Sequence, residues 1–321
     1  MFAYNQERFI GEAVAAALAQ TWSPLEIILS DDCSSDGTFR IMQLLVDAYR
    51  GPHRVRLLRA EVNQGIGAHV NKVVGEASGE LIVVAAGDDI SLPQRTETLV
   101  KRWLAGERRA HSIYSAATVI NDAGEVTGVM DGQPRSMAPG AAIRSYMDGL
   151  QGCSHAWSRE VFSVFGPVLP DTVCEDRVIA LRSTLLGGID YCPEALVKYR
   201  IHVHNVSHHQ SILPDQVMAR TRSLHARNLN IAENYLRDLA LAVSCPLAVT
   251  ADWLQAASQA ARELRDVLAD KVAFHDGGFW RKGRLVAKYL RVDPAQSVRF
   301  AVQWLLPWWY RRVQTKNLGA S

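Results

Sequence analysis

The chain has few cysteines, and none of them is spaced like the thiols of a known site. Five are present, at positions 33, 153, 174, 192 and 245. No two form the Cys-x-x-Cys pattern that zinc sites and redox motifs use. We therefore expect dispersed free thiols in a reducing compartment, acting mainly as small buried hydrophobic residues.

The chain also lacks an excess of either charge and any long apolar run. Its 35 basic and 33 acidic residues give a formal net charge of +2, whereas nucleic-acid-binding proteins usually show a clear basic excess. No segment approaches the roughly 18 apolar residues of a membrane-spanning helix. The start, Met1 to Glu7, has neither the basic region nor the apolar core of a signal peptide. We expect a cytoplasmic protein with no nucleic-acid partner.

A complete glycine fingerprint for dinucleotides is missing as well. Gly65-Ile66-Gly67 lacks the third glycine at the required spacing and follows Asn63-Gln64 in a loop instead of ending a strand. This disfavours a dinucleotide-dependent oxidoreductase, which we retain only as a third hypothesis.

Residues 1–120 alternate between helical and strand-like patterns. Helical spacing of apolar residues predicts helices at 9–20, 38–49, 68–76 and about 93–104, and short apolar runs predict strands at 25–30, 55–58 and 80–86. Such alternation, with nearly continuous apolar strands, predicts an α/β fold with a parallel sheet covered on both faces. Residues 1–3 resemble the end of a strand whose start is absent. Further along, the patterns predict a turn at 121–124, a loop at 131–140, a helix at 175–186, a strand at 188–199, and long helices at 217–243 and 250–269.

Acidic pairs follow two of the predicted strands. Asp31-Asp32 follows the first of these strands and Asp88-Asp89 the second. Ligands bind beyond the carboxyl ends of parallel strands, so the four carboxylates should meet at one edge. Paired carboxylates can hold Mg²⁺ or Mn²⁺ together with phosphate oxygens, although Asp also favours plain turns and helix caps. Both interpretations stay open on spacing alone.

Six motifs in this order make the chain resemble bacterial family 2 glycosyltransferases. They are Tyr4-Asn5-Gln6-Glu7, DDCSSDGT at 31–38, Asn63-Gln64-Gly65, Gly87-Asp88-Asp89, Cys174-Glu175-Asp176 and YRIHVHNVS at 199–207. The resemblance covers about residues 1–210. It implies a GT-A fold, which is the Rossmann-like fold of nucleotide-diphospho-sugar transferases. This α/β fold has a mixed sheet with helices on both faces, and a C-terminal helical extension would follow it in this chain.

The resemblance also implies roles for individual residues. Ala3, Tyr4, Asp31, Asp32, Asn63 and Asp88 would bind the nucleotide, Asp89 and His202 would hold Mg²⁺ or Mn²⁺, and Asp176 or Glu175 would be the general base, with Asp176 the better candidate. A carboxylate suits that step because it must take the proton of the attacking acceptor hydroxyl. Without the resemblance, an acidic pair at a helix start is explained by the helix dipole. Phe2 departs from the family, which usually has proline there.

The resemblance implies that the protein transfers a sugar, with inversion at the anomeric carbon, from a nucleoside-diphosphate donor to a hydroxyl of a glycan or lipid-linked acceptor. We expect the donor to be UDP-linked and the reaction to serve bacterial surface polysaccharide assembly. A non-catalytic nucleotide-sugar-binding scaffold of the same fold is the alternative. The segment 131–157, and Gly152 to Trp157 in particular, should decide the sugar and the acceptor.

The remainder of the chain suggests a further division. We expect a catalytic domain at 1–210, a helical extension at 211–272 and a basic, aromatic tail at 273–321. The tail contains Trp280-Arg281-Lys282-Gly283-Arg284 and a second cluster at 304–312. Aromatic and basic residues together favour a membrane interface, which would make the protein peripheral on the inner face of the plasma membrane. A helix that packs on the catalytic domain explains the tail equally well.

Overall fold

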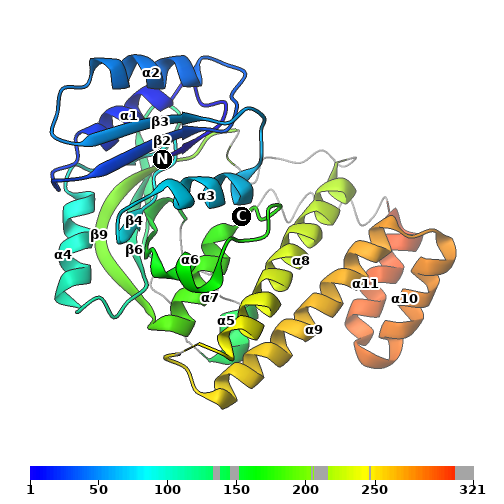
Figure 1. The fold of residues 1–321 in the computed structure, drawn as a ribbon. Coiled ribbons are helices and arrows are strands. Elements are labelled where there is room, and N and C mark those ends of the chain that lie inside the picture. Colours follow the sequence, from blue (N-terminus) through cyan, green and yellow to red (C-terminus); the bar gives the residue numbers. More distant parts are fainter. Residues whose placement is uncertain (133–137, 145–151, 204, 206–215, 246, 308–321) are drawn as a thin grey trace. The chain divides into compact units, whose positions relative to one another are not determined.

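The computed structural model describes residues 1–132, 138–144, 152–203, 205, 216–245 and 247–307 (Figure 1). The chain divides into two compact units. The first comprises Met1–Ile201 and Asn234–Ala260, and the second comprises His202–Glu233 and Ala261–Ser321. Two long helices, α8 (Val217–Ala242) and α9 (Ala251–Asp276), each contribute one part to each unit.

The first unit begins with a parallel three-stranded sheet. Its strands β1 (Phe2–Ala3), β2 (Glu26–Asp31) and β3 (Arg54–Arg59) lie in the order β1-β2-β3, and they alternate along the chain with α1 (Ile10–Leu18), α2 (Thr38–Ala48) and α3 (Ile66–Glu76). Every one of these elements except the two-residue β1 falls within two residues of its predicted range. The strand-like end expected at residues 1–3 is β1, which pairs with the last two residues of β2.

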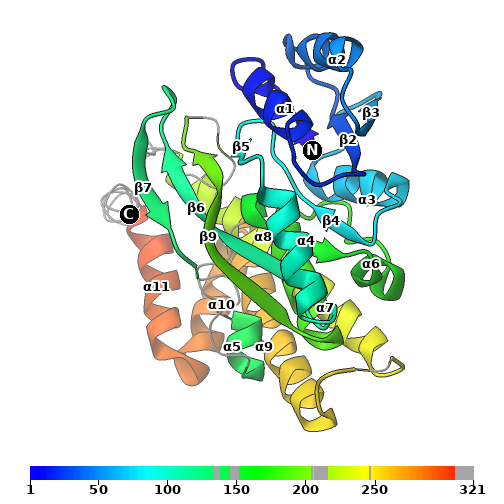
Figure 2. The ribbon, with the colours of Figure 1, turned by 90° about the vertical axis from the view of Figure 1, so that its left-hand side faces the viewer.

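A mixed sheet follows. It contains β4 (Leu81–Val83), β5 (Ile90–Ser91), β6 (Ser112–Ile120), β8 (Ala156–Ser158) and β9 (Ile189–Arg200) in the order β4-β8-β6-β9-β5, with β7 (Val126–Met130) paired to β6. The strands β7, β6 and β9 lie side by side in Figure 2. Among the strand pairs described in this sheet, β6 and β9 run parallel and the others antiparallel. A parallel bridge between Phe2 and Ala86 connects this sheet to β1. The mixed sheet that the resemblance implies is therefore confirmed, whereas the parallel sheet predicted from the alternation of strands and helices holds for β1, β2 and β3 but not for the strands of this sheet.

Helices cover these sheets and complete the first unit. They are α4 (Arg95–Ala105), α5 (Pro139–Arg144), α6 (Glu160–Phe165) and α7 (Glu175–Leu186), together with the 3₁₀ turn η1 (Gly152–Ser154). The range of α7 is the predicted one. A fully buried ion pair, Arg182 Nε to Asp238 Oδ2 at 2.7 Å, joins α7 to the end of α8 within this unit.

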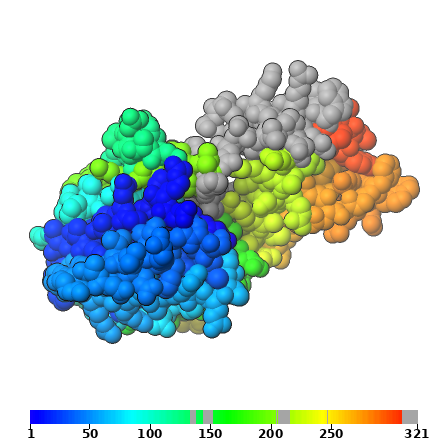
Figure 3. Space-filling model, turned by 90° about the horizontal axis from the view of Figure 1, so that it is seen from above, coloured from blue at the N-terminus to red at the C-terminus, as the bar shows by residue number. Residues whose placement is uncertain are grey.

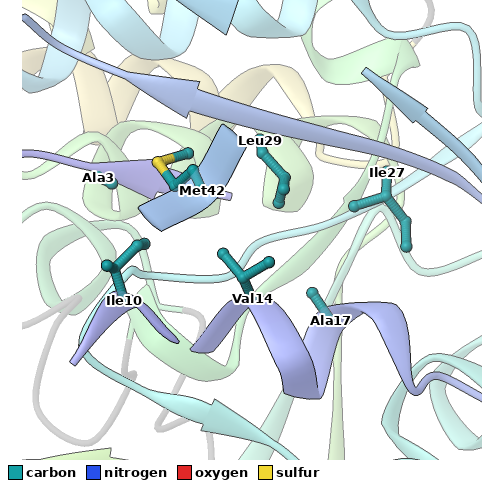
Figure 4. Packing of buried hydrophobic residues seen from close by; sticks show 7 residues of the cluster. All are labelled: Ala3, Ile10, Val14, Ala17, Ile27, Leu29 and Met42. Carbon is teal, nitrogen blue, oxygen red and sulfur yellow. The ribbon is translucent and has the colours of Figure 1, made fainter. Parts of the chain in front are cut away.

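The hydrophobic core beneath the first sheet is built on the apolar face of α1. Ile10, Val14 and Ala17 recur on one face and point toward the strands, where they meet Ala3, Ile27, Leu29 and Met42 (Figure 4). Successive β1 residues face opposite ways, as in any strand. Ala3 packs in this cluster, whereas Phe2 packs with Val70, Val74 and Val84 against α3.

The second unit is helical where it is described. It contains α10 (Phe279–Val292) and α11 (Pro294–Leu305), held together by Phe274, Leu285, Tyr289 and Phe300. Asp293 caps α11, because its side chain accepts a hydrogen bond from the Gln296 amide at 3.0 Å. None of the helices in the described ranges has the length and hydropathy needed to cross a membrane. Residues 308–312 of the expected aromatic cluster, and much of the loop predicted at 131–140, lie outside the described residues.

Candidate active site

Three neighbouring strand ends bring both acidic pairs to one edge. The Asp32 amide donates to the Ala3 carbonyl at 2.9 Å, and the Gly87 amide donates to the Phe2 carbonyl at 3.0 Å. The end of β1 therefore lies between the two acidic pairs, as the shared-edge argument predicts. In Figure 3 the N-terminal segment, in blue, lies beside the tip of the β6–β7 hairpin, in green, and Arg8 pairs with Asp122 of that tip at 3.0 Å.

Gly87 allows the strand ends to approach closely. A Cβ at this position would lie 2.3 Å from Gln6 Oε1, 2.9 Å from Ile10 Cδ1 and 3.1 Å from Ala3 Cβ. The residue before Asp88 therefore has no room for a side chain, and this packing holds the second acidic pair against β1.

We expect Gly87→Ala to destabilise the protein by about 1–3 kcal/mol, because the added methyl group overpacks this contact. The matched control is Gly75→Ala in α3, where a Cβ would meet nothing within 4 Å. That change should be neutral or stabilise by up to about 1 kcal/mol. Urea unfolding of both variants checks the difference, and equal midpoints would contradict the packing argument.

The motifs at 4–7 and 31–38 bind each other. The Asn5 amide donates to Ser34 Oγ at 2.9 Å, and the Ser35 amide returns a bond to Asn5 Oδ1 at 2.9 Å. Glu7 accepts from the Gly37 amide at 2.7 Å. Asn5 has a positive φ of 52°, a conformation that asparagine tolerates better than most residues. The two loops thus form one polar rim around the strand ends.

Asp31 and Asp32 both position loops. Asp31 is fully buried, accepts from the Ser34 amide at 3.0 Å, and lies 3.4 Å from Arg59 Nε. The two carboxylate oxygens of Asp32 accept from the Gln64 and Gly65 amides at 3.0 and 2.9 Å. Asn63 Oδ1 also accepts from the Gly65 amide, at 3.2 Å. This brings the third motif to the same edge.

The proposed base-pocket residues differ in their environment. Ala3 is buried in the hydrophobic cluster under β1, whereas Tyr4 is 47% exposed at the rim. The side chain of Tyr4 can therefore meet a ligand directly. Ala3 can shape the pocket only through its backbone and its small size.

Arg200 fixes the second acidic pair from β9. Its amide donates to Asp89 Oδ1 at 2.8 Å, and its Nε donates to the Asp88 carbonyl at 3.1 Å. Its guanidinium also pairs with Glu12 at 2.5 Å and lies over the Phe9 ring at 4.8 Å. Arg200 is therefore a structural ion-pair partner.

Asp88 and Asp89 are both buried side by side. Burial, and secondarily the neighbouring Asp88 carboxylate, raises the pKa of Asp89 to about 8. A divalent cation would offset both effects, because it replaces lost solvation and neutralises like charge. No group of three or more His, Cys, Asp or Glu side chains suited to a metal occurs in the part of the chain that the structure describes. Two carboxylates still fit Mg²⁺ or Mn²⁺, which commonly take their other oxygens from substrate phosphates and water.

The turn η1 connects the acidic pair to α7. Cys153 lies close enough to Asp88, Asp89 and Asp176 for each carboxylate to raise the pKa of its thiol, although burial is the larger cause. On one side, Arg95 Nη2 donates to the Cys153 carbonyl at 2.9 Å. On the other, a Cβ at Gly152 would lie 3.1 Å from Asp176 Oδ2. The candidate base therefore lies near the candidate metal site, although 87 residues separate Asp89 from Asp176 in the sequence.

Glu175 and Asp176 open α7. Asp176 Oδ1 accepts from the Arg177 amide at 2.8 Å, the geometry of a carboxylate at a helix N-terminus. Burial, and secondarily the charge of Asp176, raises the pKa of Glu175 to about 8. The raised pKa of Glu175 favours its protonated form at neutral pH, which makes Asp176 the better candidate for the proton acceptor.

His202 follows the end of β9 by two residues and is buried. It belongs to the second unit, so its assignment as a metal ligand remains a prediction. His204 and residues 206–207 of the same motif lie outside the described residues.

Sequence reasoning missed Arg95. This arginine is fully buried as the first residue of α4, donates to Ser91 Oγ at 2.9 Å, and feels the charge of Asp89. A cation in the first turn opposes the helix dipole, and that signal could have identified Arg95.

Trp157 ends the segment that was expected to decide specificity, but its side chain packs in the core with Val70 and Val161. Among the residues of this segment that the structure describes, Gly152 and Cys153 border the acidic residues.

Known proteins resemble the chain most clearly in its N-terminal part. Residues 1–126 match the model of glycosyl transferase family 2. EpsE of Bacillus subtilis (strain 168) is 36% identical over 97 residues, which cover 30% of this chain and 34% of EpsE. The succinoglycan biosynthesis protein ExoO of Rhizobium meliloti (strain 1021) is 35% identical over 100 residues, which cover 31% of this chain and 27% of ExoO. The chain thus spans about a third or less of the length of either relative.

Solved structures extend the likeness in fold. The crystal structure of S. aureus TarS 1-349 superposes with a TM-score of 0.52 at 15% identity, covering 95% of this chain and 90% of that one. The same fragment has a second structure, in complex with UDP-GlcNAc, with a TM-score of 0.52 at 14% identity and the same coverage. These likenesses confirm the expected fold class.

Proposed function

We propose that the chain is a member of glycosyl transferase family 2, whose model matches residues 1–126, and that it transfers a sugar from a nucleoside-diphosphate donor to a hydroxyl of a glycan or lipid-linked acceptor in bacterial surface polysaccharide assembly. The observation that carries this proposal is the position of η1, where a Cβ at Gly152 would lie 3.1 Å from Asp176 Oδ2 and the Cys153 carbonyl accepts a 2.9 Å hydrogen bond from Arg95, whose guanidinium interacts with Asp89. Transfer needs an anchored diphosphate and a base for the acceptor hydroxyl. A single displacement at the anomeric carbon, with inversion, requires no further enzyme nucleophile.

The proposal gives each acidic residue a separate role in binding or catalysis. Asp176 accepts the proton of the acceptor hydroxyl as that oxygen attacks the anomeric carbon. Asp88 binds near the ribose, and Asp31, Asp32 and Asn63 form the nucleotide side of the pocket with Ala3 and Tyr4. A UDP-linked hexose or N-acetylhexosamine is our choice of donor, in line with the UDP-GlcNAc complex of TarS 1-349.

We assign Asp89, with His202, to hold Mg²⁺ or Mn²⁺. When bound, such a cation stabilises the charge that develops on the diphosphate leaving group. The chain's own contribution is to hold the Asp89 carboxylate in place through the Arg200 amide.

A thermal-shift panel of nucleotide sugars with and without Mn²⁺ tests the proposed function. A ligand that binds only the native state raises the melting temperature, by an amount set by its concentration and dissociation constant. We expect UDP-sugars to raise it in Mn²⁺ and to do so less without the cation, and the stabilising sugar should release UDP on incubation. Binding without release or transfer would favour the scaffold alternative. No shift with any nucleotide sugar would contradict the proposal.

We further propose that the start of α10 contacts an anionic membrane surface, in keeping with a cytoplasmic enzyme whose acceptor is lipid-linked. Phe279 and Trp280 are 63% and 81% exposed, and Arg281 and Arg284 beside them are also exposed. Exposed rings at headgroup depth and cations near anionic lipid both favour such binding.

The double change Phe279→Ser with Trp280→Ser should lower binding to anionic liposomes by about tenfold or more, because each ring loses its apolar burial in the interface. Leu44→Ser, at a 57% exposed position in α2, is the matched control and should bind as the wild type does. Liposome co-sedimentation measures both. Undiminished binding by the double variant would assign α10 a purely structural role.

A further inference from the structure

A buried arginine connects two parts of the candidate active site. Arg95, the first residue of α4, is 1% exposed. Its Nη1 donates to Ser91 Oγ and its Nη2 donates to the Cys153 carbonyl, both at 2.9 Å. Ser91 ends β5, two residues after Asp89, and Cys153 is the central residue of η1. The guanidinium group therefore joins η1 to the strand that directly follows the second acidic pair.

The guanidinium of Arg95 remains charged at neutral pH in this buried position. Burial lowers its pKa to about 10, and the charges of Cys153 and Asp89 act in the opposite direction. A buried charge is costly unless hydrogen bonds offset the lost solvation. The flat guanidinium group presents its donors in a rigid fork, so it fixes its two acceptors, Ser91 Oγ and the Cys153 carbonyl, at one separation. Such a group is suited to setting a distance between two segments.

The turn η1 is the segment that Arg95 holds in place. Its last residue, Ser154, accepts at Oγ from the Ser115 amide of β6 at 3.3 Å. Its first residue, Gly152, lies against the candidate base, since a Cβ there would be 3.1 Å from Asp176 Oδ2. A shift of η1 would therefore move this turn directly toward or away from the Asp176 carboxylate.

We propose that Arg95 is a positioning residue, which holds η1 so that the Asp176 carboxylate lies at a set distance from Asp88-Asp89. It acts through the Cys153 carbonyl and takes no proton itself. This role rests on the proposed function, in which the acidic pair lies at the donor and Asp176 takes the proton of the acceptor hydroxyl. Both groups must be in place for one displacement, and a misplacement of about 1 Å costs about 10²-fold in rate.

The first test is the Arg95→Met variant, which lacks both hydrogen bonds. We expect kcat for sugar transfer to fall by about 10²-fold while donor binding stays within about threefold of wild type. Thermal shift with a UDP-sugar and Mn²⁺ measures the binding. Loss of the positive charge should not weaken cation binding at Asp89, because the guanidinium and the cation repel each other. An unchanged kcat, or a fall in donor affinity as large as the fall in kcat, would overturn the proposal.

The control for a general loss of stability is Leu99→Ala, one turn further along α4. Leu99 is fully buried and belongs to a hydrophobic cluster with Ile113 and Leu196. Its truncation leaves a cavity, so it should lower the melting temperature but keep kcat within about threefold of wild type. A fall in kcat equal to that of Arg95→Met would assign both effects to stability and would also overturn the proposal.

If Arg95→Met does not fold, Gly152→Ala tests the other end of η1. The added methyl group would lie too close to Asp176 Oδ2 and would displace the carboxylate. We expect the same pattern, a lower kcat with donor binding retained. An unchanged kcat in Gly152→Ala would show that the position of η1 does not control the base.

The alkylation rate of the Cys153 thiol, followed by peptide mass spectrometry, is a measurement that needs no activity. Burial raises the pKa of this thiol, so it should react slowly in the wild type. When η1 is released in Arg95→Met, the rate should rise at least about tenfold, whereas Leu99→Ala should react as the wild type does. If the wild type transfers no sugar from any UDP-sugar, the proposed function fails and this rate alone decides. An unchanged rate in Arg95→Met would then overturn the role of Arg95.

Discussion

Asp176→Asn is expected to lower turnover by about 10²–10⁴-fold while leaving donor binding within about threefold of wild type. General-base catalysis contributes an acceleration of that size, and the asparagine side chain keeps the shape and the Oδ1 acceptor of the Arg177 amide bond. Sugar transfer or UDP release in steady state gives kcat, and the thermal shift with a UDP-sugar gives binding. Wild-type turnover in this variant would refute the assignment of the base.

The matched control is Glu175→Gln at the neighbouring position. The pKa of Glu175 is raised to about 8, so its side chain is neutral at pH 7 and glutamine resembles it. We expect turnover to fall by less than about tenfold, well short of the loss of the base. A large loss in Glu175→Gln with little change in Asp176→Asn would exchange the two roles.

The Glu175→Gln variant should also differ from wild type in how its stability depends on pH. A carboxyl group whose folded pKa is raised stabilises the protein below its unfolded pKa, and this contribution is lost as the pH rises toward the folded pKa. For Glu175 this window extends from its ordinary value of 4.5 to about 8. The stability of Glu175→Gln relative to wild type should therefore increase across the window. Unfolding midpoints at pH 5 and pH 8, both without divalent cation, measure it.

Asp89→Asn should remove the cation dependence of nucleotide-sugar binding. Replacing a group that hydrogen-bonds to a metal ligand lowers metal affinity by roughly 10–100-fold, and replacing the ligand itself should lower the affinity at least as much. Asparagine keeps the oxygen that accepts from the Arg200 amide, so the loop conformation is preserved and only the charge is lost. Titration of Mn²⁺ at fixed UDP-sugar, followed by thermal shift, measures the change.

The Asp88→Asn variant distinguishes the role of Asp88 from that of Asp89. If Asp88 lies at the ribose, its loss should weaken nucleotide binding to a similar degree with and without Mn²⁺. The cation response should survive in Asp88→Asn and disappear in Asp89→Asn. The reverse pattern would exchange the assignments of the two residues.

Local patterns along the chain predicted much of this fold. The apolar spacing placed α1, α2, α3 and α7 within two residues of their observed ends, because each of these helices buries one regular face. The two- and three-residue strands β5 and β8 were not predicted, since so few residues cannot display a period of two. Their positions depend on distant partners, Val197 and Lys198 for β5 and Leu81 to Val83 for β8.

By itself, the sequence determined the order of the motifs, the acidic ends of the strands and the family resemblance, because these depend on residue types at short spacings. The grouping of Asp88 and Asp89 with Asp176 was decided only by the tertiary structure, through Arg95 and η1. So were the raised pKa values of Asp89 and Glu175, because burial and the distances between charges arise only when segments far apart in the chain pack together.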